Sequence, residues 1–233
     1  METLGNDLIL LSIRPSGVIG TAAKLGFGLS GSELVRLTAL GRVEVEGGQI
    51  VIHDEAPTGD VLLDEALKSM HGGLPAQYWT AGRGDVTRPY LERLVGAGII
   101  SLDRRKALGL VSVAGWTVVD AGRLAAARAR LDAVAYGSDG ADSEQVALAG
   151  LATAIGLPPL VYPGFAGWSA RRRVARVGRD SGSTADLTAA PRTANTTAVW
   201  SAVNGVSHAV ASAAAGAAHH AVDHGGHSGG GHH

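Results

Sequence analysis

The chain has 233 residues and a formal net charge of -1, with 45% hydrophobic and 18% charged residues, which is typical of one folded domain with a substantial core. The absence of cysteine excludes disulfides, thiolate nucleophiles and cysteine-based metal sites. Because the net charge is close to zero, any contact with nucleic acid or acidic lipid must come from a local basic patch. We find neither a secretory leader nor the run of roughly 20 apolar residues that a membrane span requires, so we expect a cytoplasmic protein.

Hydrophobic periodicity and turn residues predict the elements of the first part of the chain. We expect, in order, a buried helix at residues 4–13, an irregular glycine-rich segment at 14–28, a helix at 32–40 and a β-hairpin with a Gly-Gly turn at 43–52. A capped helix then follows Asp60, and Pro75 begins a short helix that bears Tyr78 and Trp79.

The second part of the chain is predicted to be helical apart from one further hairpin. We expect helices at 89–97, 120–135, 143–155, 168–177 and 196–214, a hairpin that pairs 99–102 with 111–119, chain breaks at 158–159 and 163–164, and a mobile segment at 180–194. The fold class is therefore mainly α: a compact helical-bundle domain over residues 1–215 with two peripheral β-hairpins. Residues 216–233, rich in Ala, Gly and His, are predicted to be a disordered tail.

The stretch from Asp54 to Leu67 combines a turn, a helix cap and an amphipathic helix. Pro57 fixes its own φ and Gly59 permits a positive φ, so Pro-Thr-Gly-Asp predicts a tight turn. The Asp60 carboxylate can then accept hydrogen bonds from the first N–H groups of the helix. One stripe of apolar residues follows at helical spacing, namely Leu63, Ala66, Leu67 and Met70. We interpret the neighbouring acidic residues as cap and surface groups rather than as catalytic groups.

This stretch resembles the signature of the Golgi phosphoprotein 3 family. Four further segments share the resemblance: Gly28-Leu29, Leu40-Gly41-Arg42-Val43, Leu94 to Ile100, and Val199-Trp200-Ser201-Ala202-Val203. The resemblance spans about residues 4–210 and implies a mostly α-helical domain around a helix bundle. The bias toward Ala, Gly, Val and Arg indicates a GC-rich bacterial genome, so we predict a bacterial-type member.

The resemblance also implies a function. Eukaryotic members of the family bind phosphatidylinositol 4-phosphate on Golgi membranes and hold the cytosolic tails of glycosyltransferases there. By register, the family's lipid-contacting positions hold Thr21, Ser30, Gly84 and Thr87 in this chain. None of these supplies the charge-assisted hydrogen bonds that a phosphomonoester requires. We therefore predict that the neighbouring Lys24, Arg83 and Arg88 are the lipid-binding residues.

Two other basic clusters are candidates for a membrane or oligomer contact. Arg104, Arg105 and Lys106 fall at the predicted tip of the second hairpin. In the eukaryotic members of the family, the corresponding hairpin supports self-association. Arg171 and Arg172 belong to a basic amphipathic helix of the kind that lies on membrane surfaces. For both clusters the alternative is a solvated surface.

Other functional classes lack the necessary residues. The chain has no Gly-x-Ser-x-Gly elbow and no phosphate-binding loop that ends in Gly-Lys-Ser/Thr, so we predict that it is not an enzyme and needs no cofactor. The histidines of the tail are expected to bind metal only adventitiously, because a disordered segment fixes no coordination geometry. We predict no metal site and no nucleic-acid partner.

Three functional hypotheses remain. The preferred one is a peripheral membrane adaptor that binds anionic phospholipid and, by resemblance, the cytosolic tails of membrane enzymes. The second is a protein-interaction module that binds enzyme tails or itself, as a homo-oligomer, without lipid. The remote third is a winged-helix-like DNA binder, in which a helix and a hairpin with a basic tip contact phosphates.

Overall fold

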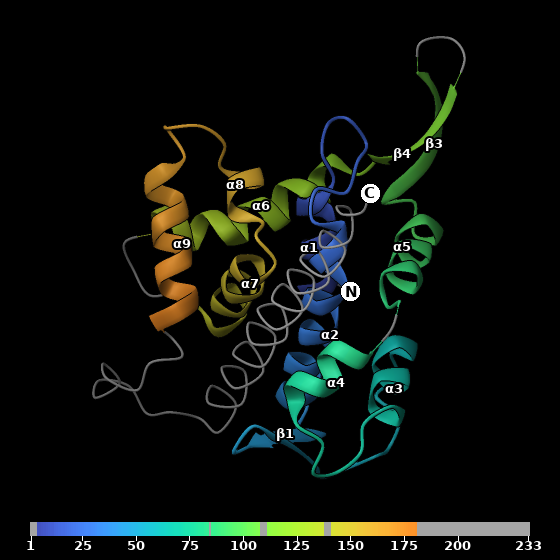
Figure 1. Cartoon of the computed structure of the whole chain (residues 1–233), viewed down its shortest axis with the longest axis vertical. Helices are drawn as coiled ribbons and strands as arrows, with labels where there is room; N and C mark the ends of the chain where they lie inside the picture. Colours follow the sequence, from blue (N-terminus) through green and yellow to red (C-terminus); the bar gives the residue numbers. More distant parts are fainter. Residues whose placement is uncertain (1–3, 84, 108–110, 138–140, 181–233) are drawn as a thin grey trace, which may run out of the picture.

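A computed structural model describes residues 4–83, 85–107, 111–137 and 141–180 (Figure 1). The described chain is mainly helical with two small antiparallel sheets, as predicted. Its elements are α1 (Leu4–Ser12), α2 (Ala22–Ala39), β1 (Val43–Glu46), β2 (Gln49–Ile52), α3 (Val61–Lys68), α4 (Ala76–Gly82), α5 (Thr87–Gly96), β3 (Ile100–Ala107), β4 (Val111–Val118), α6 (Ala121–Tyr136), α7 (Ser143–Ala154), α8 (Pro158–Val161) and α9 (Trp168–Asp180).

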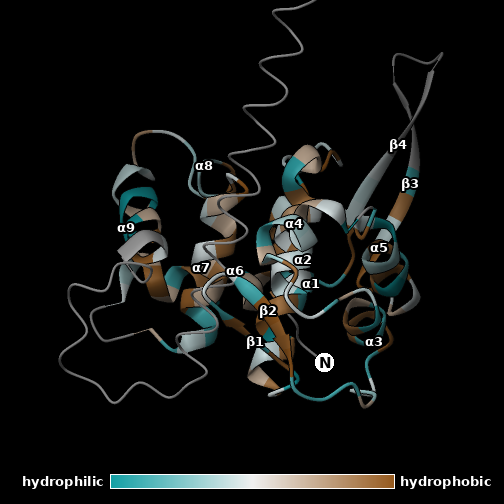
Figure 2. Ribbon diagram, turned by 60° about the horizontal axis from the view of Figure 1, so that its bottom comes forward, coloured by the Kyte–Doolittle hydropathy of each residue, from teal (hydrophilic) through white to brown (hydrophobic). Residues whose placement is uncertain are grey.

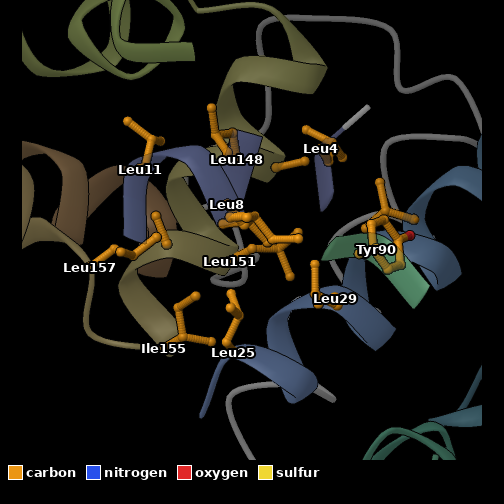
Figure 3. Packing of buried hydrophobic residues seen from close by; sticks show 14 of the residues in the cluster. Leu4, Leu8, Leu11, Leu25, Leu29, Tyr90, Leu148, Leu151, Ile155 and Leu157 are labelled. Carbon is orange, nitrogen blue, oxygen red and sulfur yellow. The ribbon is translucent and has the colours of Figure 1, made fainter. Parts of the chain in front are cut away.

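The core is built around α1, every residue of which is buried. This helix contacts α2, α5, α6, α7 and α8, which explains why its residues 8–11 are all Leu or Ile rather than apolar on one stripe. Its buried Asp7 is paired with Arg130 of α6. Figure 3 shows Leu8 beside Leu151, with Leu25 and Ile155 close by in the same cluster. Burial of each such side chain stabilises the fold by about 1.5–3 kcal/mol.

Helix α2 begins earlier than predicted, because residues 22–28 are helical rather than irregular. Its glycines disfavour a helix in isolation. Packing reverses this preference, since Leu25 and Leu29 lie one turn apart and are both fully buried. A Cβ at position 28 would come within 3.0 Å of Ile155, so Gly28 permits α2 to approach the end of α7 closely.

The two hairpins differ in how well they were predicted. In the first, β1 pairs with β2 around Gly47 and Gly48, whose φ values of 56° and 85° suit the expected two-residue turn. In the second, the expected tip at 103–106 is wrong: these residues belong to β3 and pair with residues 112–115 of β4. A two-stranded ribbon can be solvated on both faces, so charged residues need not mark its turn. Figure 1 shows this hairpin extending away from the helices.

Near the end of the described chain, a short helix replaces a predicted break. The predicted break at Pro158-Pro159 is instead the start of the short helix α8, because proline is well suited to a first helical turn. Helix α9 continues to Asp180. The predictions for a mobile segment up to 194, a helix at 196–214, the boundary at 215 and the tail at 216–233 fall outside the described residues.

Candidate functional site

The Asp60 turn has the predicted capping geometry. One carboxylate oxygen of Asp60 accepts a hydrogen bond from the Leu62 N–H at 3.1 Å. The turn before it is also fixed, since the backbone N–H and the hydroxyl of Thr58 donate to the Asp64 carboxylate at 2.6 and 2.7 Å. These two hydrogen bonds lower the pKa of Asp64. Both acidic groups therefore stabilise the start of α3.

Asp60 also joins three helices. Arg36 of α2 donates to its carboxylate at 2.9 Å, and Arg93 of α5 donates to both of its oxygens. Burial alone would raise the pKa of Asp60, but the hydrogen bonds from Arg93 and Arg36 outweigh it and lower the pKa to about 2. The carboxylate is thus ionised at neutral pH and holds two guanidinium groups in place.

A second, deeper ion pair lies next to this cluster. Glu33 of α2 is only 1% exposed and accepts a hydrogen bond from Arg83 at 3.3 Å. The same guanidinium lies over the Trp79 ring, 5.7 Å from its centroid. Burial raises the pKa of Glu33 to about 7, although Arg83 opposes this shift. Arg83, predicted to bind lipid, is therefore turned inward, and its side chain is 15% exposed.

A cavity of about 250 Å³ lies between the start of α2 and the connection from α4 to α5. Its lining residues are Ala22, Ala23, Gly26, Phe27, Thr80, Ala81, Asp85 and Thr87. Thr87 is one of the positions that the family resemblance assigns to lipid contact. Of the described lining residues, only Asp85 is ionisable, so no lining side chain is a cation.

The structure does not bring the three predicted lipid-binding residues together around this cavity. Lys24 is exposed on the first turn of α2 and is not among the lining residues. Arg88 is 77% exposed and pairs with Glu92 at 2.8 Å on the same helix. Of the other positions given by register, Ser30 is buried and donates to the Gly26 carbonyl, and Gly84 lies outside the described residues.

Helix α9 presents a different group of cations. Hydrophilic and hydrophobic residues alternate along α9 in Figure 2. The inner face of the helix is apolar, with Ala170 and Val174 fully buried against α6 and α7. Arg172, Arg173 and Arg176 are exposed on the other side. Arg172 lies over the Trp168 ring at 4.7 Å, and Arg173 donates to the Gly137 carbonyl. Within the described part of the chain, none of these three guanidinium groups has a carboxylate partner.

The two predicted residues of α9 have different surroundings. Arg171 donates to the carbonyls of Tyr162 and Gly164 at 2.7 and 2.9 Å, so it holds the preceding turn, whereas Arg172 faces solvent. Sequence analysis missed Phe165, which is 98% exposed beside this helix. The signal for it was an aromatic residue in a Pro-Gly-Phe-Ala-Gly turn, where an apolar core residue is not expected.

The remaining predictions concern the cations of the second hairpin, membrane-spanning helices and metal sites. Arg104, Arg105 and Lys106 lie on β3, but their side chains are outside the described set. No helix in the described ranges is long and apolar enough to cross a membrane. The same residues contain no group of three or more His, Cys, Asp or Glu arranged to hold a metal ion, and the histidines of the tail lie beyond them.

Comparison with known families identifies the chain. A family model described as Golgi phosphoprotein 3 (GPP34) matches residues 4–224, which include all the elements described above. A comparison with curated proteins gave no match. The family match agrees with the prediction made from the Asp54–Leu67 stretch, whose turn and cap organise the Asp60 cluster. This chain belongs to the Golgi phosphoprotein 3 family.

Proposed function

We propose that this protein is a cytoplasmic adaptor that attaches peripherally to anionic phospholipid membranes through the outer face of α9. The observation that carries the proposal is the set of exposed guanidinium groups of Arg172, Arg173 and Arg176, which have no carboxylate partner among the described residues. Each cation near an anionic bilayer contributes about 1 kcal/mol to binding. Tails of membrane enzymes are the proposed cargo, on family resemblance.

The cavity beside α2 argues for charge-dependent rather than phosphoinositide-specific binding. A phosphomonoester is best bound by several guanidinium or ammonium groups. The described cavity lining carries a carboxylate instead, and Arg83 is engaged by Glu33. We therefore expect phosphatidylserine, cardiolipin and phosphatidylinositol 4-phosphate to recruit the protein according to their charge.

Vesicle flotation tests this proposal. The full chain is mixed with phosphatidylcholine vesicles that contain no anionic lipid, phosphatidylserine, cardiolipin or phosphatidylinositol 4-phosphate, at low and at physiological salt. We expect binding to every anionic vesicle, weakening as salt screens the charges. The double variant Arg172→Glu/Arg176→Glu should lower binding at least tenfold, because about 1.4 kcal/mol corresponds to a factor of ten.

The control is Arg88→Glu, a reversal at another exposed helical arginine. It already pairs with Glu92, so we expect less than a twofold change in vesicle binding. A strong loss in Arg88→Glu with none in the α9 variant would contradict the proposal and favour the residues predicted from the family's register. Failure of the unaltered chain to bind any vesicle would exclude a lipid function.

One observation favours the protein-interaction module as a second candidate. Strands β3 and β4 form a sheet of their own, and they project from the helices in Figure 1. Strand edges that are not paired within a chain can pair with a second chain. Light scattering at increasing protein concentration would detect the resulting oligomer. The DNA-binding hypothesis stays a prediction and is tested by a gel shift with a salt series.

A further inference from the structure

The turn between α8 and α9 is built to display an aromatic side chain. Tyr162 is buried at the end of α8, and Gly164 turns the chain with a φ of 68°. Phe165 then points into solvent. The backbone N–H of Trp168 donates a hydrogen bond to the Phe165 carbonyl at 3.0 Å. Trp168, the first residue of α9, is 52% exposed.

This turn is held in place by close contacts. A Cβ at Gly167 would come within 2.4 Å of the Tyr162 carbonyl oxygen, so only glycine permits the chain to fold back here. Arg171 then donates to the carbonyls of Tyr162 and Gly164. The exposure of Phe165 is therefore a property of a fixed turn rather than of a loose loop.

A single exposed aromatic residue is common on protein surfaces and needs no explanation. Phe165 differs because an exposed tryptophan and three exposed arginines follow it on the adjoining helix. Trp168 lies under the Arg172 guanidinium, at 4.7 Å. Aromatic rings beside long cationic side chains are the pattern of segments that lie at a membrane interface, where the ring enters the apolar layer and the cation stays at the headgroups.

The positive charge of the exposed α9 face indicates which kind of partner can bind there. Arg172, Arg173 and Arg176 have no carboxylate partner among the described residues, whereas most arginines of the helical core region have one. A basic peptide or a second copy of the same surface would be repelled. An anionic bilayer satisfies both the cations and the aromatic rings.

We infer that the α8–α9 turn is an interfacial membrane anchor, in which Phe165 and Trp168 enter the headgroup–acyl boundary of an anionic phospholipid bilayer while Arg172 and Arg176 contact lipid phosphates. This inference rests on the proposed function and adds to it that attachment includes apolar insertion. Charge alone would leave the protein on the surface and make binding entirely salt-sensitive. Insertion of the two rings retains part of the binding at physiological salt.

Partition of the full chain onto phosphatidylserine-containing vesicles at physiological salt tests the anchor. We expect Phe165→Ser to lower the partition coefficient about tenfold and Phe165→Trp to preserve it. The matched control is Val61→Ser, which removes another exposed apolar side chain from α3 and should change partition less than twofold.

A fluorescent label reports insertion directly. Because the chain has no cysteine, Ala166→Cys accepts a single polarity-sensitive dye in the turn, and Val61→Cys serves as the control. The dye at position 166 should shift to the blue and brighten with anionic vesicles, while the dye at position 61 should not.

The outcomes separate the two proposals. If the unaltered chain binds anionic vesicles but Phe165→Ser binds equally well and the dye at 166 does not respond, the anchor is wrong and electrostatic attachment stands. If the unaltered chain binds no vesicle, both are wrong. If Phe165→Ser instead abolishes a dimer detected by light scattering, the turn is a protein interface and the anchor is wrong.

Discussion

The arginines around Asp60 and the arginines of α9 carry the same charge in opposite surroundings. Arg36, Arg83 and Arg93 are partly buried, and each donates to a carboxylate of the core. Arg172 and Arg176 are exposed on a helix face where no described carboxylate meets them. The first group stabilises the contact between helices, and the second remains available to an external anion. Pairing and burial, rather than the presence of an arginine, thus decide whether a guanidinium group is available to a ligand.

Removal of the Asp60 carboxylate should give the largest effect on stability. Asp60→Ala deletes the cap of α3, which costs about 1 kcal/mol. It also leaves Arg36 and Arg93 without their partner, which we expect to cost about 2 kcal/mol more, because solvent screens part of this half-buried pair. Urea unfolding should therefore show a loss of about 3 kcal/mol in the free energy of unfolding.

Asp60→Asn separates the two contributions. The amide oxygen still accepts from the Leu62 N–H, so only the ionic part should be lost, about 2 kcal/mol. Equal losses below about 0.5 kcal/mol in both variants would mean that the cluster does not stabilise the fold. The distinction between the two groups of arginines would then be wrong.

Glu33 should make stability depend on pH. Burial raises its pKa from 4.5 to about 7, so between these values the folded chain holds a proton that the unfolded chain has released. The free energy of unfolding should therefore fall as the pH rises through this window. The expected change is on the order of 3 kcal/mol, since one pKa unit corresponds to about 1.4 kcal/mol.

The variant Glu33→Gln isolates this contribution from other titrating groups, because the amide resembles the protonated acid in shape. Relative to the unaltered chain, the variant should gain stability as the pH rises from 4.5 to 7. Parallel pH profiles of the two proteins would show that folding does not raise the pKa of Glu33. The attraction of Arg83 would then offset the effect of burial.

The sequence predicted local features of the fold better than it predicted the site. The cap at Asp60, the Gly47-Gly48 turn and the apolar stripe after Asp60 depend on neighbouring residues, so pattern alone located them. The early start of α2 depends on packing of Leu25 and Leu29 against distant helices, which no local pattern contains.

The candidate site required tertiary information for a similar reason. Lys24, Arg83 and Arg88 neighbour the family's lipid positions in sequence, and the prediction of lipid contact rests on that alone. Glu33 lies 50 residues from Arg83 along the chain, so the sequence alone does not indicate that the two residues form an ion pair. Phe165 was overlooked because the sequence alone did not show that a fixed turn displays its ring to solvent.

The smallest expected effects on stability come from two arginines of α9, Arg171 and Arg176. Arg171→Ala removes hydrogen bonds to two carbonyls, and we expect a loss of about 1 kcal/mol in the free energy of unfolding. Arg176→Ala removes an exposed side chain with no described partner, so the loss should stay within about 0.5 kcal/mol. Urea unfolding of both variants measures this difference.

Vesicle binding tests the exposed cation of Arg176 separately from the fold. Arg176→Ala should weaken binding to anionic vesicles about fivefold, because roughly 1 kcal/mol is lost with the cation, although the fold is unchanged. Loss of stability without loss of binding would instead assign Arg176 to the fold. A loss of binding without a loss of stability would thus distinguish the α9 surface from the Asp60 cluster, whose arginines are paired with carboxylates.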